Sequence, residues 1–86
     1  MPRYEVSIKK SAVKEIEALP EQNRQRVVEI IESLADNPRP VGSRKLSGTA
    51  NVYRQWDGDY RVVYEIKDQE LIVNVVKVGN RREVYR

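Results

Sequence analysis

The sequence of 86 residues contains neither cysteine nor histidine. Without cysteine there is no disulfide, no thiolate metal site and no cysteine nucleophile. Without histidine, the usual general base near neutral pH and the commonest metal ligand are both missing. Any acid–base catalysis must therefore use tyrosine, carboxylate, lysine or arginine. The sequence predicts no metal site and no cofactor.

Long apolar runs are missing as well. No run approaches the ~20 residues of a membrane span, and the first residues, MPRYEVSIKK, have no apolar signal-peptide core. The sequence thus predicts a cytoplasmic protein that makes no membrane contact. Its length predicts a single domain, residues 1–86, that buries only about 60–65% of its unfolded surface. We therefore expect any site to be an open groove or face.

Charge is distributed unevenly along the chain. Residues 1–37 carry 6 Lys or Arg against 7 Asp or Glu, a net of −1, whereas residues 38–86 carry 10 against 6, a net of +4. A positive field in the second half favours a polyanionic partner there. Basic residues that keep strand edges soluble would give the same count, so charge alone leaves both interpretations open.

The first half predicts a strand followed by two helices. Residues 4–8 alternate as a half-buried strand does. Ser11 is the expected N-cap of a first helix that places Ala12, Val13, Ile16 and Leu19 on one face and ends at Pro20. A second helix is expected from Glu21 to Asp36, with an apolar face made by Val27, Val28, Ile30, Ile31, Leu34 and Ala35.

The second half predicts a loop and then three strands. Residues 37–51 contain two prolines and two glycines and should be irregular, as a crossover, a binding loop or both. Strands at 51–56, 59–67 and 71–79 form an antiparallel meander, with a type I′ turn at Asp57–Gly58. The expected fold is α+β, of order βααβββ, with a helical hairpin covering one sheet face.

Alternation along the strands assigns side chains to faces. Tyr60, Val62, Tyr64 and Ile66 should face the helices, which leaves Arg61 on the other side. If Arg54 and Trp56 share that side, an uncovered face displays all three together. An isolated strand arginine is more often part of a solvated face, but arginines converging from several strands favour a site.

A set of basic and aromatic side chains could carry chemistry on such a face. Guanidinium groups match phosphate through parallel N–H donors, which suits a nucleic-acid backbone. Trp56 either stacks on a base or pads the sheet. The remaining members come from the loop and the C-terminal segment, and the full set is Arg44, Lys45, Arg54, Trp56, Arg61, Arg81, Arg82 and Tyr85.

RNA can be cleaved without metal when the 2′-hydroxyl is deprotonated and attacks the adjacent phosphate. An enzyme must position that hydroxyl, stabilise the added negative charge and protonate the leaving 5′-oxygen. In a chain without histidine, a tyrosine can act as base if nearby cations lower its pKa from about 10. Tyr85 has Arg81, Arg82 and Arg86 as neighbours in sequence, which permits this role.

The order of several short motifs resembles that of a known family. The segments KLSG, VYR, GDYRVVYEI and VVKVGNRREVY, together with the helical hairpin and its Leu-Pro junction, resemble the RelE branch of the RelE/ParE toxins over essentially the whole chain. Each motif is short and made of common residues. Their order and spacing carry the resemblance.

The resemblance implies a type II toxin that enters the ribosomal A site and cuts the mRNA codon there. It implies that Arg61 steadies the scissile phosphate, that Arg81 stabilises charge or protonates the leaving group, and that Tyr85 acts as base or orients the 2′-hydroxyl. Arg54 takes a substrate-holding position. RNA binding is expected of Arg44, Lys45, Arg54, Trp56 and Arg82, because their charge or aromatic ring suits a nucleic acid. The expected partners are the ribosome, mRNA and an acidic or amphipathic antitoxin encoded nearby, whose complex with the toxin can bind operator DNA.

The sequence also departs from the RelE pattern. Ser47 stands where the family often has arginine, and Trp56 stands in place of a second basic residue. The segment between Gly79 and Tyr85 is short, which leaves the acid role open between Arg81 and Arg82. Two alternatives to the nuclease remain: a ParE-like inhibitor of DNA gyrase, and an inactive relative that binds its antitoxin as a co-repressor.

Overall fold

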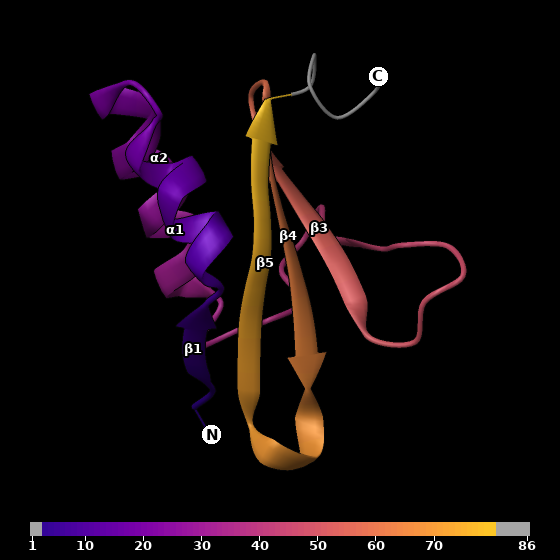
Figure 1. Ribbon diagram of the computed structural model, residues 1–86. Coiled ribbons are helices and arrows are strands. Elements are labelled where there is room, and N and C mark those ends of the chain that lie inside the picture. The colour runs from indigo at the N-terminus through magenta and orange to yellow at the C-terminus, as the bar shows by residue number, and fades with distance from the viewer. Residues whose placement is uncertain (1–2, 81–86) are drawn as a thin grey trace.

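The computed structural model describes residues 3–80. Two helices lie beside a twisted sheet (Figure 1). Along the chain the elements are β1 (Glu5–Ile8), α1 (Lys10–Glu17), α2 (Glu21–Ser33), β2 (Arg44–Lys45), β3 (Val52–Asp57), β4 (Tyr60–Lys67), the 3₁₀ helix η1 (Asp68–Glu70) and β5 (Ile72–Asn80). No helix within residues 3–80 has the length and apolar character needed to cross a membrane.

The strands form a single sheet in the order β1-β5-β4-β3-β2. β1 runs parallel to β5, and the other neighbouring pairs are antiparallel. The α+β fold predicted from the sequence is confirmed, including the helical hairpin and the antiparallel meander. β2 is an addition, because Arg44 and Lys45 pair with Arg54 and Tyr53 although the sequence predicted an irregular loop here.

Both helices pack on one face of the sheet, as Figure 1 shows. The core joins helix residues such as Ala12, Val27 and Ile31 to strand residues such as Tyr64 and Val75. Tyr64 is fully buried, and its hydroxyl donates to the carbonyl oxygen of Pro38 at 2.8 Å. The predicted core face of β4 is therefore confirmed, and no helix of residues 3–80 packs on the opposite face of the sheet (Figure 1).

Several local predictions are wrong. The first helix begins at Lys10, two residues after the end of β1, so Lys9 and not Ser11 takes the N-cap position, and no side chain caps the helix. Val13 is 37% exposed because the helix turns it away from the sheet. The second helix ends at Ser33, and residues 34–36 form turns.

The hairpin turn also differs in type from the prediction. Asp57 pairs with Tyr60, so Gly58 and Asp59 are its two central residues. Gly58 has φ +60°, whereas Leu71 is the one non-glycine residue within 3–80 with positive φ. A glycine with positive φ at the first central position alone fits a type II′ turn, which also matches the twist of the strands.

Candidate functional site

The sheet register brings basic side chains together on the helix-free face. Directly paired residues of antiparallel strands share a face, and Arg54 pairs with Val63 while Trp56 pairs with Arg61. Arg44 pairs with Arg54 from β2. We call Arg44, Arg54, Trp56 and Arg61 the arginine face. The grouping that alternation suggested for Arg54, Trp56 and Arg61 is therefore present.

Arg54 and Arg61 are diagonal neighbours on this face, a relation that places Cβ atoms about 7–8 Å apart. The Nε atom of each is buried and has no hydrogen-bond partner in the described part of the chain. A buried polar group without a partner costs about 1–3 kcal/mol. Two such groups side by side indicate a place where a ligand supplies the acceptors.

Neither Arg54 nor Arg61 forms an ion pair with a carboxylate within residues 3–80. The ion pairs among residues 3–80 involve Arg3, Arg26, Arg39 and Lys77, and none involves Arg54 or Arg61. Glu65 lies on the same face, opposite Val52 and diagonal to Arg54, yet forms no ion pair with it. Neither guanidinium is therefore neutralised by a carboxylate within residues 3–80.

Trp56 contributes an aromatic surface beside Arg61. The guanidinium carbon of Arg61 lies 5.9 Å from the centre of the Trp56 ring. A cation over an aromatic face is attracted by the ring quadrupole, so Trp56 orients Arg61 without neutralising its charge. Both sequence-based interpretations of Trp56, base stacking and padding, are compatible with this position.

One other predicted site residue, Lys45, is not brought to this face. Lys45 pairs with Tyr53 and therefore points to the opposite side of β2 from Arg44. Arg81, Arg82 and Tyr85 lie outside the described residues. β5 ends at Asn80, the residue before Arg81, and Gly79 pairs with Arg61 without a side chain of its own to cover it.

A second polar cluster, which sequence reasoning missed, lies at the other end of the sheet. Arg39 donates from both terminal nitrogens to Asp68, at 3.1 and 2.7 Å, and from Nε to the Tyr53 hydroxyl at 3.2 Å. Tyr4 also donates to Asp68, at 2.6 Å. We call Tyr4, Arg39, Tyr53 and Asp68 the clasp. It ties the start of the 37–51 loop to η1 and to the beginning of β1.

The clasp shifts the acidity of its members. Hydrogen bonds from Arg39, and then from Tyr4, lower the pKa of Asp68 to about 2, because they stabilise its charged form. The same carboxylate raises the pKa of Tyr4. Nearby, burial raises the pKa of Tyr64 by disfavouring its phenolate. These groups hold ordinary charges at neutral pH, which fits a structural role.

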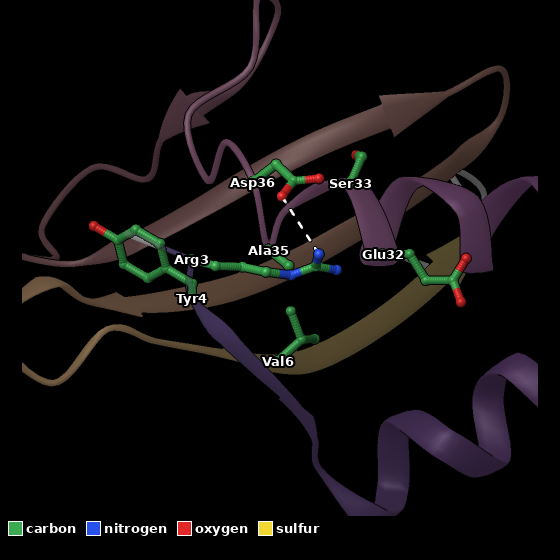
Figure 2. A pocket seen from close by; sticks show the side chains of 7 residues that line it. All are labelled: Arg3, Tyr4, Val6, Glu32, Ser33, Ala35 and Asp36. Atoms are coloured by element: carbon green, nitrogen blue, oxygen red, sulfur yellow. Dashed lines mark ion pairs between the residues drawn. The ribbon is translucent and has the colours of Figure 1, made fainter. Parts of the chain in front are cut away.

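Three surface grooves lie away from the arginine face. Figure 2 shows one of about 640 Å³ between the start of β1 and the end of α2, where Arg3 and Asp36 form an exposed ion pair at 3.8 Å. Two others lie beside the ends of β5 and β4. Arg54 and Arg61 line none of these three. Within residues 3–80 no three acidic side chains gather as a metal-binding group.

Comparison with known proteins gives one consistent result. A family model described as the ParE toxin of the type II toxin-antitoxin system parDE matches residues 6–85. A Methanocaldococcus jannaschii protein named RelE1 is 31% identical over 98% of this chain and 97% of its own length. The mRNA interferase toxin RelE of Escherichia coli K12 is 36% identical over 76% of this chain and 67% of its own.

Solved structures agree with these relatives. The archaeal RelE–RelB complex of Pyrococcus horikoshii contains a chain that matches with a TM-score of 0.82 at 32% identity, covering 94% of this chain and 97% of that one. The similarity therefore extends over nearly the whole length of both chains.

Proposed function

This chain belongs to the RelE/ParE superfamily of type II toxins, and from that premise we propose that it is a ribosome-dependent endoribonuclease. Its substrate is the mRNA codon in the ribosomal A site, and cleavage stops translation. The RelE relative of E. coli is named an mRNA interferase, and the arginine face offers the positive surface that an RNA backbone requires.

The proposed reaction transfers the scissile phosphate from the 5′-oxygen to the adjacent 2′-oxygen. Tyr85, as phenolate, takes the proton of the 2′-hydroxyl while the 2′-oxygen forms a bond to phosphorus. The bond from phosphorus to the 5′-oxygen breaks, and Arg81 or Arg82 stabilises the leaving oxygen or supplies its proton. The products are a 2′,3′-cyclic phosphate and a 5′-hydroxyl end, so no metal ion is needed.

The observation that carries this proposal is the pair of unpartnered arginines. Arg54 and Arg61 each present a buried Nε without a partner within the described chain. Phosphate oxygens are suitable acceptors for these two arginines, because a guanidinium binds phosphate through parallel N–H donors. Arg61 would hold the scissile phosphate, Arg54 and Arg44 the neighbouring backbone, and Trp56 a base beside them.

The same scaffold supports a second candidate function, inhibition of DNA gyrase. It is favoured by the match to the ParE family model over residues 6–85. A third possibility is a chain that has lost catalysis and acts only as an antitoxin-binding co-repressor on operator DNA. The sequence retains Arg61, Arg81 and Tyr85 together, and this favours the nuclease.

We propose an antitoxin as the binding partner in the cell. The similar P. horikoshii chain is part of a RelE–RelB complex. An antitoxin should offset the basic arginine face with acidic residues and cover apolar side chains left at the surface, such as Ile8 and Val13. We expect it to cover Arg61 or to displace the segment that contains Tyr85. A complex that leaves both untouched would contradict this.

Primer extension on translating ribosomes tests the proposal. The parent should produce cuts inside A-site codons, and Arg61→Ala and Tyr85→Phe should both abolish them. Arg24→Ala removes the same charge from α2, away from the arginine face, and should cut as the parent does. Unchanged cutting by Tyr85→Phe would remove Tyr85 as the base. Growth arrest with intact mRNA and inhibited gyrase would favour the ParE-like alternative.

A further inference from the structure

The side chain of Glu15 on α1 accepts hydrogen bonds from the end of β5, beyond the last residues at which β1 pairs with this strand. One carboxylate oxygen accepts the backbone N–H of Val78 at 2.9 Å, and the other accepts Nζ of Lys77 at 3.0 Å. Glu15 is 32% exposed and Val78 is buried. The carboxylate thus holds both a main-chain group and a side chain of two consecutive residues.

The sheet itself leaves this edge open. The pairing of β1 with β5 ends where Ile8 meets Val75, and α1 begins two residues later. β5 then bulges, because Val63 pairs with Lys77 and Tyr64 with Val75, so Val76 has no cross-strand partner. Bulges bend a strand and increase its twist. Beyond the bulge, β5 is held by β4 on one side and by Glu15 on the other.

This end of β5 lies directly before the proposed catalytic segment. Val78 is three residues from Arg81, and Gly79 pairs with Arg61 of the arginine face. The hydrogen bond from Val78 to Glu15 therefore fixes the part of β5 that pairs with Arg61.

We infer that Glu15 is a positioning residue, which fixes the end of β5 beside Arg61 of the arginine face by holding Val78 and Lys77. The inference rests on the proposed nuclease function and deepens it. Glu15 does not touch RNA. Its second contact compensates the charge of Lys77, which, unlike Arg54 and Arg61, has a carboxylate partner.

The test compares Glu15→Ala, Glu15→Asp and Glu15→Gln with Glu17→Gln as the control, since Glu17 is an exposed neighbour on the same helix. Single-turnover cleavage on programmed ribosomes gives the maximal rate and the half-saturating concentration. Amide hydrogen exchange, followed by NMR, reports the Val78 N–H independently of any activity. Thermal unfolding identifies a variant that does not fold.

Glu15→Ala should lower the maximal rate about 10- to 100-fold with little change in half-saturation, because misplacement of a catalytic group by about 1 Å can have an effect of this size. It should speed Val78 exchange about tenfold, because the hydrogen bond to a charged acceptor is lost. Glu15→Gln keeps an acceptor oxygen for Val78 and loses only the ion pair with Lys77. Its maximal rate should therefore fall less than about fivefold, the effect of losing an exposed ion pair. Glu15→Asp should fall between them.

The rate should follow Val78 exchange across the series. If Glu15→Ala does not fold, the Asp and Gln variants still carry this comparison. Fast Val78 exchange with a parent-like rate would overturn the inference, as would a Gln variant as slow as the Ala variant. A parent that cuts no RNA would contradict the proposed function instead. In that case, unchanged Val78 exchange in Glu15→Ala would contradict the proposal that Glu15 holds the end of β5, and faster exchange would support it.

Discussion

The arginines of this sheet occupy two opposite kinds of surroundings. In the clasp, Arg39 donates to Asp68 and Tyr53 with three nitrogens and lies 5.2 Å from the centre of the Tyr53 ring. On the arginine face, Arg54 and Arg61 each keep a buried Nε without a partner within residues 3–80. The residue type is the same, and the neighbours differ.

The difference separates stability from binding. A carboxylate beside an arginine uses its donors and fixes the chain, as Asp68 does for the loop that starts at Asn37. Cross-strand neighbours that are apolar or aromatic, as Val63 and Trp56 are for Arg54 and Arg61, orient a guanidinium without using its donors. Removing a clasp arginine should therefore affect folding, and removing one from the arginine face should affect function.

The largest effect is expected from Arg61→Ala. Cleavage on programmed ribosomes should fall about 10²- to 10³-fold, the range found when one donor to a transition-state anion is removed. The free energy of unfolding should stay the same or rise slightly, because a buried unpartnered nitrogen is lost. Single-turnover kinetics and urea unfolding of the same preparations measure both quantities.

The control for Arg61→Ala is Arg24→Ala, which changes net charge equally from α2. It should leave cleavage and stability near the parent values. An Arg61→Ala protein that unfolds more easily but cuts at the parent rate would show that Arg61 stabilises the fold, as Arg39 does. The distinction between the clasp and the arginine face would then be wrong.

Arg39→Ala should show the reverse pattern. Stability should fall by about 1–2 kcal/mol, reduced from the value for a buried network because Arg39 and Asp68 are 44% and 50% exposed. Cleavage per folded molecule should be unchanged. Arg39→Lys should recover only part of the loss, since an ammonium cannot match the two parallel donors that Asp68 accepts. Urea unfolding monitored by Trp56 fluorescence measures the change.

Acidic pH should remove the contribution of the clasp to the free energy of unfolding. Hydrogen bonds from Arg39 and then Tyr4 lower the pKa of Asp68 in the folded chain to about 2, from an ordinary value of 3.8, so below pH 4 the unfolded state binds more protons than the folded one. Protonation then favours unfolding. The stability gap between the parent and Asp68→Asn should be full above about pH 4 and should close as pH falls toward about 2.

Urea unfolding of both proteins at several pH values tests this, with Asp59→Asn as a control for a carboxylate in the hairpin turn. A gap that stays constant between pH 4 and pH 2 would show that Asp68 is not stabilised by Arg39 in solution.

Alternation and turn residues were enough to predict most of the fold. The apolar series through Tyr64 identified the core face of β4, and the same alternation grouped Arg54, Trp56 and Arg61. The sequence was insufficient where pairing is short or irregular. β2 has two residues, and the bulge at Val76 leaves no mark on a pattern of consecutive valines.

The clasp could not be predicted because its members are far apart in the chain. Arg39 lies 29 residues from Asp68 and 14 from Tyr53. The only local sign is the pair of prolines that flank Arg39 and restrict the backbone there. Glu15 was missed for the same reason, since Val78 is 63 residues away. Contacts of this kind depend on how helices and loops return to the sheet.

The smallest expected effect separates two adjacent residues. Arg44 shares the arginine face with Arg54, whereas Lys45 points to the other side of β2. Arg44→Gln should weaken binding of a 2′-O-methyl RNA, which cannot be cut, and should reduce the slope of log affinity against log salt by about 0.7, the value for one phosphate contact on a single strand. Lys45→Gln removes the same charge one residue away and should leave that slope unchanged. Fluorescence anisotropy at several salt concentrations measures both variants. Equal slopes for the two variants would mean that RNA affinity depends only on the net charge of β2. The face on which a basic residue lies would then have no effect.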